Sequence, residues 1–506
     1  MMRPGLSSLL RAAHPAVPAL LALLLVAAPT AAQTPTPAKL TLADALRLAA
    51  EHSEALAVAR AGEARADADL MRARSAALPQ VSFSGGYDRT LASQYSDLSS
   101  DSGGAVTPCP AFAPNPTLPL ESRVAEIERA ADCGGIGGGG GGLGGINFSS
   151  LPFGQRNVYQ YGLTFSQALY TGGRITAQRN IARSSRESAS LETIAAETLL
   201  ELEVTEAFYN AALSDRLLAI AESGLQQATA TVEQTQLSFQ AGRQPEFELL
   251  RAQVARDNQR PFMIRRKADR EIAYLRLRQL LELPPDVPLV IDIELDGVTL
   301  PPPAPFAEAL ATVNRETTPA DRIGVKQAET VVRLREGGVE AARAERMPSV
   351  ALTSAMGQVG YPSTGAFPGV GDFRTNWTLG AAVQVPIFTG QRVRAGEMAA
   401  RAELAQAQAQ LKQAHELAAL DAATAQQDLL AAEAVWEASG SAVQQAERAY
   451  QIAELRNREG LSTQLELSDS RLSLQVAQAN RAQAARDVQV ARARVALLPS
   501  LPVRLR

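Results

Sequence analysis

Two carboxylates near the C-terminal quarter of the chain are the clearest candidates for electrostatic chemistry. Glu466 and Asp469 are three positions apart, so they share one face of any helix that contains them. Their counterparts 218 residues earlier are Glu248 and Arg251, which keep one acid and replace the other by a base. Such a pair attracts cations if it faces a confined aqueous space, and otherwise it is an ordinary solvated helix face.

Groups that could perform covalent catalysis or hold a metal do not form a recognisable pattern. His52 and His415 are isolated, and the sequence has no Ser/His/Asp, metal-ligand or cofactor constellation. The run CGGIGGGGGGLGGINF is followed by neither Gly-Lys-Ser/Thr nor a helix start, which favours a surface loop over a phosphate-binding loop. We therefore expect no enzymatic activity, no metal and no cofactor.

The first 32 residues have the pattern of a secretory signal peptide. Arg3 and Arg11 precede an apolar run at 17–28, and small residues follow at 30–32. Removing this segment leaves 47 basic and 53 acidic residues, a net charge of 47 − 53 = −6. An acidic chain without a basic block does not favour nucleic acid as a partner.

The two cysteines of the mature chain lie in one irregular segment. An exported protein meets an oxidising compartment, so we expect Cys109 and Cys133 to form a disulfide that pins a surface loop. The alternative is a pair of free thiols.

An internal duplication organises the chain, with an offset of 218 residues. LYTGGR at 169–174 nearly recurs as IFTGQR at 387–392. Gly242 falls on Gly460 at the same offset, and Leu283-Pro284 falls on Leu501-Pro502. Landmarks that stay in register over more than a hundred residues predict two copies of one structural unit.

Each copy is expected to contain a helix, a strand, an outward loop, a second strand, a long helix, a turn and a returning helix. The long helices are rich in Ala, Gln, Glu, Leu and Arg, which are strong helix formers. The first repeat spans 33–284, with a helix at 41–77, strands at 80–90 and 157–170, a long outer loop at 95–150, and helices at 173–240 and 245–282. After a linker or equatorial segment at 285–305, the second repeat spans 306–502, with a helix at 306–346, strands at 349–361 and 375–388, and helices at 391–459 and 461–498.

The strand segments alternate in the manner of membrane-spanning β-strands. One face of the segment at 157–170 carries large apolar residues, namely Tyr159, Tyr161, Leu163, Phe165 and Leu169, and the other face carries small or polar ones. A soluble sandwich would show the same alternation, but little else in the chain could form its opposing sheet. Four strands cannot close a barrel in a bilayer, so the membrane interpretation requires several chains, and three chains would supply twelve strands.

Together these features resemble the outer-membrane efflux protein family, the TolC-like channels. The family's strand-to-helix signature is matched by residues 169–174 and again by 385–392, where Gln391 replaces the second glycine. The resemblance implies a mainly α fold with membrane β-structure: a homotrimer with a shared 12-stranded outer-membrane barrel and a tunnel of coiled-coil helices in the periplasm. It also implies contact with outer-membrane lipid, a periplasmic adaptor (membrane fusion) protein, and a proton-driven or ATP-driven inner-membrane pump.

The resemblance also implies roles for particular residues. Glu466, Asp469 and Glu248 are expected at the pore constriction, where copies from three chains would form a cation-attracting ring. The turns at the tips of the helices, expected to form the gate and the adaptor contact, hold Gly242, Arg243, Arg458, Gly460 and Leu461. The strand-to-helix turns hold Thr171, Gly172, Gly173, Thr389 and Gly390, and we expect Gly172 and Gly390 to carry the positive φ.

Three functions of different kinds remain open from the sequence. The first is the outer-membrane duct of a tripartite efflux pump, and the second is the duct of a type I protein secretion system. The third is a trimeric coiled-coil surface protein, which would be exported and helical but would predict a single C-terminal anchor. A porin is disfavoured because it would need about 16 strands and little helix.

Overall fold

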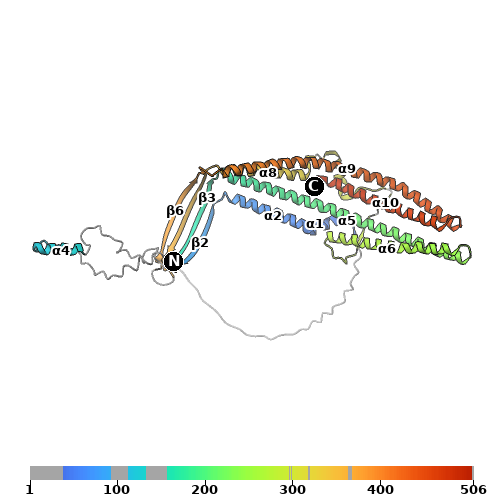
Figure 1. Cartoon of the computed structure of the whole chain (residues 1–506), viewed down its shortest axis with the longest axis horizontal. Helices are drawn as coiled ribbons and strands as arrows, with labels where there is room; N and C mark the ends of the chain where they lie inside the picture. The colour runs from blue at the N-terminus through green and yellow to red at the C-terminus, as the bar shows by residue number, and fades with distance from the viewer. Residues whose placement is uncertain are drawn as a thin grey trace, which may run out of the picture.

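The structure is a computed structural model that describes residues 38–92, 112–132, 157–293, 295, 297, 299–316, 319–362 and 367–503. A four-stranded sheet lies at one end, and long helices run away from it side by side (Figure 1). The expected signal peptide at 1–32 and the expected disulfide between Cys109 and Cys133 lie outside the described residues. No helix among the described residues is long and apolar enough to cross a membrane.

The two longest helices are equivalent under the duplication. Helix α5 spans Arg174–Gln240 and helix α9 spans Arg392–Arg458, and both contain 67 residues. At 1.5 Å per residue each is about 100 Å long. Their returning partners are α6, Glu246–Leu280, and α10, Gln464–Leu497. Helix α10 therefore begins at residue 464 and not at the expected 461, because Thr463 is its N-cap.

The helices that precede the strands differ from the sequence expectation. A single helix was expected at 41–77, but α1, Leu42–His52, and α2, Glu54–Ser75, are separated at Ser53. The Ser53 hydroxyl accepts the Leu56 N–H at 3.3 Å and so caps a second helix where one continuous helix was expected.

The corresponding helix of the second repeat, expected at 306–346, is also divided. A short 3-10 turn, η4 (Ala304–Phe306), leads into α7, Ala307–Glu316. A second turn, η5 (Pro319–Asp321), precedes α8, Ile323–Ala344. Pro319 lacks a backbone N–H and cannot continue a helical hydrogen-bond ladder, which explains the interruption.

The sheet contains four antiparallel strands in the order β2-β3-β5-β6. Their bounds are Gln80–Arg89, Asn157–Tyr170, Ser349–Gly360 and Phe373–Gln384. The last strand was expected at 375–388 but ends at 384, since Pro386 cannot donate to the ladder. The sheet has two unpaired edges in this chain, β2 and β6.

The alternation expected from the sequence places apolar residues on one face of the sheet. Leu163 pairs with Phe83 on one side and Met356 on the other, and Met356 pairs with Trp377. Phe83 and Trp377 are both exposed in the single chain. The opposite face carries small residues, and at its centre Gly162 pairs with Ser84 and Gly357.

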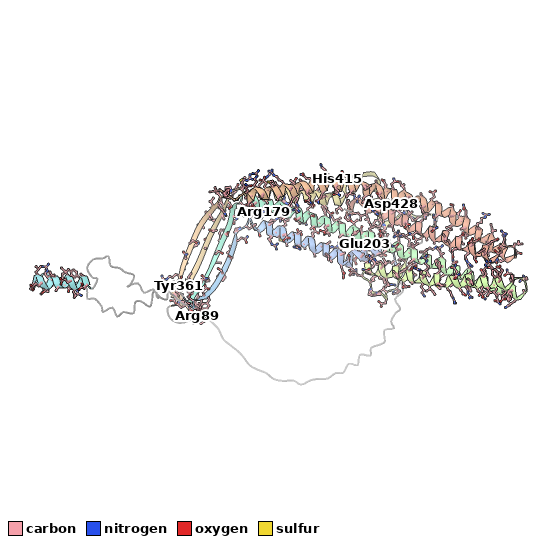
Figure 2. The ribbon with its side chains drawn as sticks, in the orientation of Figure 1. Arg89, Arg179, Glu203, Tyr361, His415 and Asp428 are labelled. Carbon is pink, nitrogen blue, oxygen red and sulfur yellow. The ribbon has the colours of Figure 1, made fainter. Side chains whose placement is uncertain are left out.

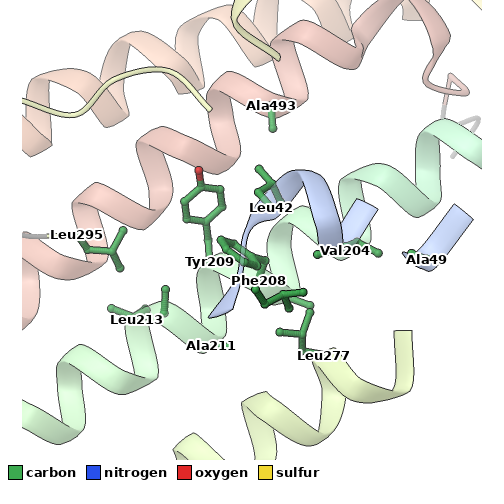
Figure 3. Packing of buried hydrophobic residues seen from close by; sticks show 14 of the residues in the cluster. Leu42, Ala49, Val204, Phe208, Tyr209, Ala211, Leu213, Leu277, Leu295 and Ala493 are labelled. Carbon is green, nitrogen blue, oxygen red and sulfur yellow. The ribbon is translucent and has the colours of Figure 1, made fainter. Parts of the chain in front are cut away.

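The main hydrophobic core lies about halfway along the helices. Phe208 and Tyr209 of α5 are buried there with Leu42 of α1, Leu277 of α6 and Ala493 of α10 (Figure 3). The segment at 285–305, expected to be a linker or equatorial segment, contributes to this region, because β4, Leu289–Ile291, pairs in parallel with β1, Ala38–Leu40. The core forms where the half-length helices end against the long ones.

The expected outer loop at 95–150 contains a helix. Helix α4, Leu120–Asp132, is the described part of this segment together with residues 112–119. Within α4, the Glu126 carboxylate accepts from the Arg129 guanidinium at 2.6 and 2.7 Å, one turn apart. The sequence analysis did not anticipate a helix within this outer loop, and the glycine-rich run lies outside the described part.

Candidate functional site

Two helical turns lie at the end of the molecule farthest from the sheet (Figure 1). We call them tip turn 1, residues 241–245 between α5 and α6, and tip turn 2, residues 459–463 between α9 and α10. In tip turn 1 the Arg243 N–H donates to the Ser238 carbonyl at 2.9 Å, and in tip turn 2 the Leu461 N–H donates to the Arg456 carbonyl at 2.7 Å. Both bonds close the helix end in the Schellman manner, which requires a left-handed residue.

Glycine supplies that left-handed residue in both turns. Gly242 has φ 70° and Gly460 has φ 75°. The turns differ in how the next helix starts. Pro245 precedes α6 without a side-chain cap, whereas the Thr463 hydroxyl accepts the Glu466 N–H at 3.3 Å.

The candidate carboxylates occupy two different environments. Glu466 and Asp469 are exposed on one face of α10, and neither carboxylate has a hydrogen bond or ion pair with the described part of the chain. Glu248 is less exposed than Glu466 and Asp469, and its Oε1 atom lies 3.9 Å from Nη1 of Arg251. Its Oε2 atom accepts the backbone N–H of Gln464 at 3.3 Å. The structure therefore separates Glu248 from the exposed pair and uses it to connect α6 to the first turn of α10.

Gln464 is a functional candidate that sequence reasoning missed. Its side chain is 2% exposed, and Nε2 donates to Thr235 Oγ1 of α5 at 2.9 Å and to Asn457 Oδ1 of α9 at 3.3 Å. A glutamine in the first turn of a helix normally faces solvent, and its counterpart under the duplication is the exposed Glu246. Only the approach of the two tip turns to each other makes this position a contact between repeats.

Two arginines near tip turn 2 differ in their environment: Arg458 is exposed and Arg471 is buried. Arg458 forms an ion pair with Glu454 at 2.8 Å on the exposed side of α9. Arg471 of α10 is buried near Tyr450 of α9, and its Nε and Nη1 atoms have no hydrogen-bond partner within the described residues. Burial lowers the pKa of Arg471. Leu461, by contrast, is an exposed apolar side chain at the apex.

The strand-to-helix turns, at the opposite end of the long helices, each contain two residues with positive φ. Gly172 and Gly390 have φ of 61° and 56°, as expected, but Gly173 (91°) and Gln391 (67°) are left-handed as well. The positive φ expected at the first position is confirmed, and the second position of each turn shares it. Thr171 Oγ1 accepts the Ile175 N–H at 3.4 Å, although the N-cap position itself is Gly173.

Comparison with known proteins decides the family. A family model described as outer membrane efflux protein matches residues 137–282 and 320–498, which is more than half of the chain. The chain belongs to the outer membrane efflux protein family. One matched segment lies within each half of the internal duplication, so the family match and the repeat agree.

Solved structures of outer-membrane channels share the fold. The outer membrane protein VceC of Vibrio cholerae superposes with a TM-score of 0.67 at 19% identity, covering 90% of this chain and 96% of VceC. The open-state MtrE outer membrane channel of Neisseria gonorrhoeae superposes with a TM-score of 0.65 at 19% identity, covering 92% of this chain and 89% of MtrE. The Campylobacter jejuni CmeC outer membrane channel superposes with a TM-score of 0.67 at 15% identity, covering 92% of this chain and 87% of CmeC. Comparison with functionally curated proteins gave no match.

Membership of the outer membrane efflux protein family settles the class and location of the protein. The family consists of passive outer-membrane channels and not enzymes, which confirms the expectation from the sequence. The protein lies in the outer membrane and extends into the periplasm. The sheet leaves apolar side chains exposed at one end of the helices, and the tip turns lie at the opposite end.

Proposed function

We propose that this protein is the outer-membrane duct of a tripartite efflux pump, formed by three copies of the chain. The supporting observation is the sheet, whose β2 and β6 edges are unpaired in one chain. A bilayer does not tolerate unpaired backbone at a sheet edge, and bacterial barrels have at least about 8 strands. Three chains that join β2 of one copy to β6 of the next give 12 strands and remove every edge.

The helices continue this barrel as a tunnel through the periplasm. Helices α5 and α9, about 100 Å long, follow β3 and β6 after the strand-to-helix turns. Helix α10 contacts both α9 and α5, so the two repeats form one wall of a tunnel. Transported molecules pass along this tunnel without a chemical step.

The tip turns are the surface on which we place the adaptor. They lie farthest from the membrane end and present the exposed Leu461 and Arg243 to the periplasm. The inner-membrane pump, proton-driven or ATP-driven, then reaches the duct through the adaptor and selects the cargo. A type I secretion system would use the same duct, but no contact among the described residues favours it. A coiled-coil surface protein is disfavoured because the strand pairs are embedded between duplicated helices.

The oligomeric state and the adaptor contact test this proposal together. The full-length protein extracted from membranes should have three times the mass of one chain and should form conducting channels in planar bilayers. A photo-crosslinking amino acid at Leu461 should capture a periplasmic adaptor, whereas the same probe at Phe367, beyond the opposite end of the sheet, should not. A monomer without conductance would refute the duct, and identical crosslinks from both positions would refute the docking site.

A further inference from the structure

Positive charge is concentrated where the strands pass into the helices. The four segments 72–80, 171–183, 343–349 and 389–401 contain ten arginines and only two acids, Glu345 and Glu397, a net charge of 10 − 2 = +8. The whole chain has a net charge of −4, so all other residues together carry −4 − 8 = −12. We call this group of segments the arginine belt.

The belt has a single position along the molecule. Its segments are the C-terminal ends of α2 and α8 and the N-terminal ends of α5 and α9, all adjacent to the sheet. Figure 2 shows Arg179 at this junction, while Arg89 and Tyr361 mark the other end of the strands. The side chains of Arg72, Arg174, Arg183, Arg343, Arg346 and Arg394 are all exposed.

Helix stability does not explain the basic residues at the start of α5 and α9. The N-terminus of a helix carries partial positive charge, so acids are favoured there and bases are not. Both long helices have no acid in the first turn and instead begin with Arg174 and with Arg392 and Arg394. Helix α6, at the other end of the molecule, begins with Glu246 and Glu248 as the rule predicts.

One buried carboxylate positions three of these guanidinium groups. Glu397 accepts hydrogen bonds from Arg343 at 3.2 Å, Arg346 at 2.8 Å and Arg401 at 2.6 Å. Hydrogen bonding from Arg343 lowers the pKa of Glu397, which therefore stays ionised. Each of the three arginine side chains remains more than half exposed, so the cluster presents an excess of two positive charges and several free N–H donors to solvent.

Exposed apolar residues border the belt on the side of the sheet. Ile387 is 95% exposed and Phe388 is 88% exposed in the single chain, and Leu169 and Tyr170 lie at the matching place in the first repeat. Apolar side chains followed at once by arginines match the order of layers in a bilayer, in which a headgroup layer of about 5–7 Å covers the hydrocarbon. The first turn of α5 and of α9 spans about 5 Å along the helix axis.

We propose that the arginine belt binds the phosphate groups of anionic phospholipids in the periplasmic leaflet of the outer membrane. Guanidinium groups match phosphate oxygens in a bidentate manner, and a cluster of arginines next to a membrane span attracts anionic lipid. The belt thereby sets the depth of the channel in the membrane and enriches anionic lipid around it. This inference rests on the membrane insertion of the sheet, which is part of the proposed function.

The lipid preference of the reconstituted protein tests the belt. Trp377 is exposed on the apolar face of β6, so brominated phospholipids around the protein should quench its fluorescence. Competition between brominated phosphatidylglycerol and phosphatidylethanolamine gives their relative association constant, which should favour the anionic lipid at least threefold at low salt. The relative association constant should fall toward one in high salt, because salt screens exposed charges.

The test variant combines Arg174→Gln, Arg183→Gln and Arg394→Gln, three exposed residues without an ion pair to the described part of the chain. Its anionic preference should fall at least twofold. The matched control combines Arg260→Gln, Arg265→Gln and Arg448→Gln, which removes the same charge from exposed positions outside the belt and should leave the preference unchanged.

Each other outcome contradicts a specific statement. Equal quenching by both lipids in the wild-type protein refutes the belt, and an unchanged preference in the test variant refutes the assignment to these arginines. Dissociation of the oligomer in the test variant alone would assign the arginines to subunit contacts instead. The absence of quenching by either lipid would refute membrane insertion itself and hence the proposed function, so the two failures are distinguishable.

Discussion

The strand-to-helix turns show how the same local motif is built with different residues in the two repeats. Each turn needs two consecutive left-handed residues, and the first repeat uses Gly172 and Gly173 while the second uses Gly390 and Gln391. A side chain in the left-handed region costs about 1–2 kcal/mol, so Gln391 is a strained residue that the second turn tolerates. The two first-position glycines differ in what surrounds them. A Cβ atom on Gly172 would lie 2.2 Å from Met347 Cβ, whereas a Cβ on Gly390 would meet no atom within 4 Å.

This difference predicts unequal effects of the same substitution. Gly390→Ala should lose about 1 kcal/mol through the backbone angle alone. Gly172→Ala should lose about 1–3 kcal/mol more, because Met347 and the chain that carries it must move. Thermal denaturation of the purified oligomer measures both, with Gly338→Ala as a control, since a Cβ at this helical glycine also meets no atom within 4 Å. Equal losses at 172 and 390 would contradict the steric part of the argument.

At the scale of elements, the tip turns join helices of the two repeats through polar contacts. The buried Gln464 side chain links α10 to α5 and α9, while Glu248 of α6 accepts the Gln464 backbone N–H. The nearby apolar clusters are small: Tyr450, Ala453, Leu467 and Leu474 form one, and the other has three residues. The tip is therefore held largely by hydrogen bonds, which open at lower cost than the core around Phe208.

Removing the Gln464 side chain should loosen the tip without unfolding the molecule. Gln464→Ala leaves the buried Thr235 hydroxyl without this donor, a local cost of about 1–3 kcal/mol. We expect an increased conductance or open probability in planar bilayers and a nearly unchanged thermal midpoint. Gln478→Ala, on the same helix and without a side-chain hydrogen bond in the described part of the chain, is the matched control. A lowered conductance would contradict a restraining role for Gln464.

At the scale of the whole molecule, equivalent acids have different surroundings in the two repeats. The second repeat leaves Glu466 and Asp469 exposed and unpaired within the described residues, whereas the first repeat pairs Glu248 with Arg251. In the proposed trimer the exposed pair contributes six carboxylates at the periplasmic end. A ring of carboxylates in a narrow aqueous passage raises the local concentration of cations.

Neutralising the exposed pair should therefore reduce the cation selectivity of the channel. Glu466→Gln combined with Asp469→Asn should move the cation-to-anion permeability ratio, obtained from reversal potentials in a salt gradient, at least twofold toward one. Glu416→Gln combined with Asp428→Asn removes two exposed carboxylates from the middle of α9 and should have little effect. Figure 2 shows Asp428 at this place, well away from the tip turns. If both double variants changed the ratio equally, the whole surface charge and not a local ring would set the selectivity.

The amino-acid sequence alone determined the duplication, the long helices and the membrane strands, because each depends on periodicity within a segment. Helix α9 gives one example, because Leu404, Ala407, Leu411, Ala414 and Ala418 are spaced 3-4-3-4 along the sequence, as in a coiled-coil seam. The three alanines are buried in the structure. The segment at 41–77 shows the limit of prediction from periodicity, because the break at Ser53 depends on one capping hydroxyl within an otherwise helical pattern.

The tertiary structure decided which residues act across segments. The burial of Gln464, the pairing of Glu248 with the neighbouring repeat and the convergence of three arginines on Glu397 join residues from different helices. Residues 343 and 397 are 54 positions apart. No periodicity within one segment encodes such a contact, because it depends on how two helices are placed side by side. Local patterns specify the elements, and only their packing specifies the polar contacts between them.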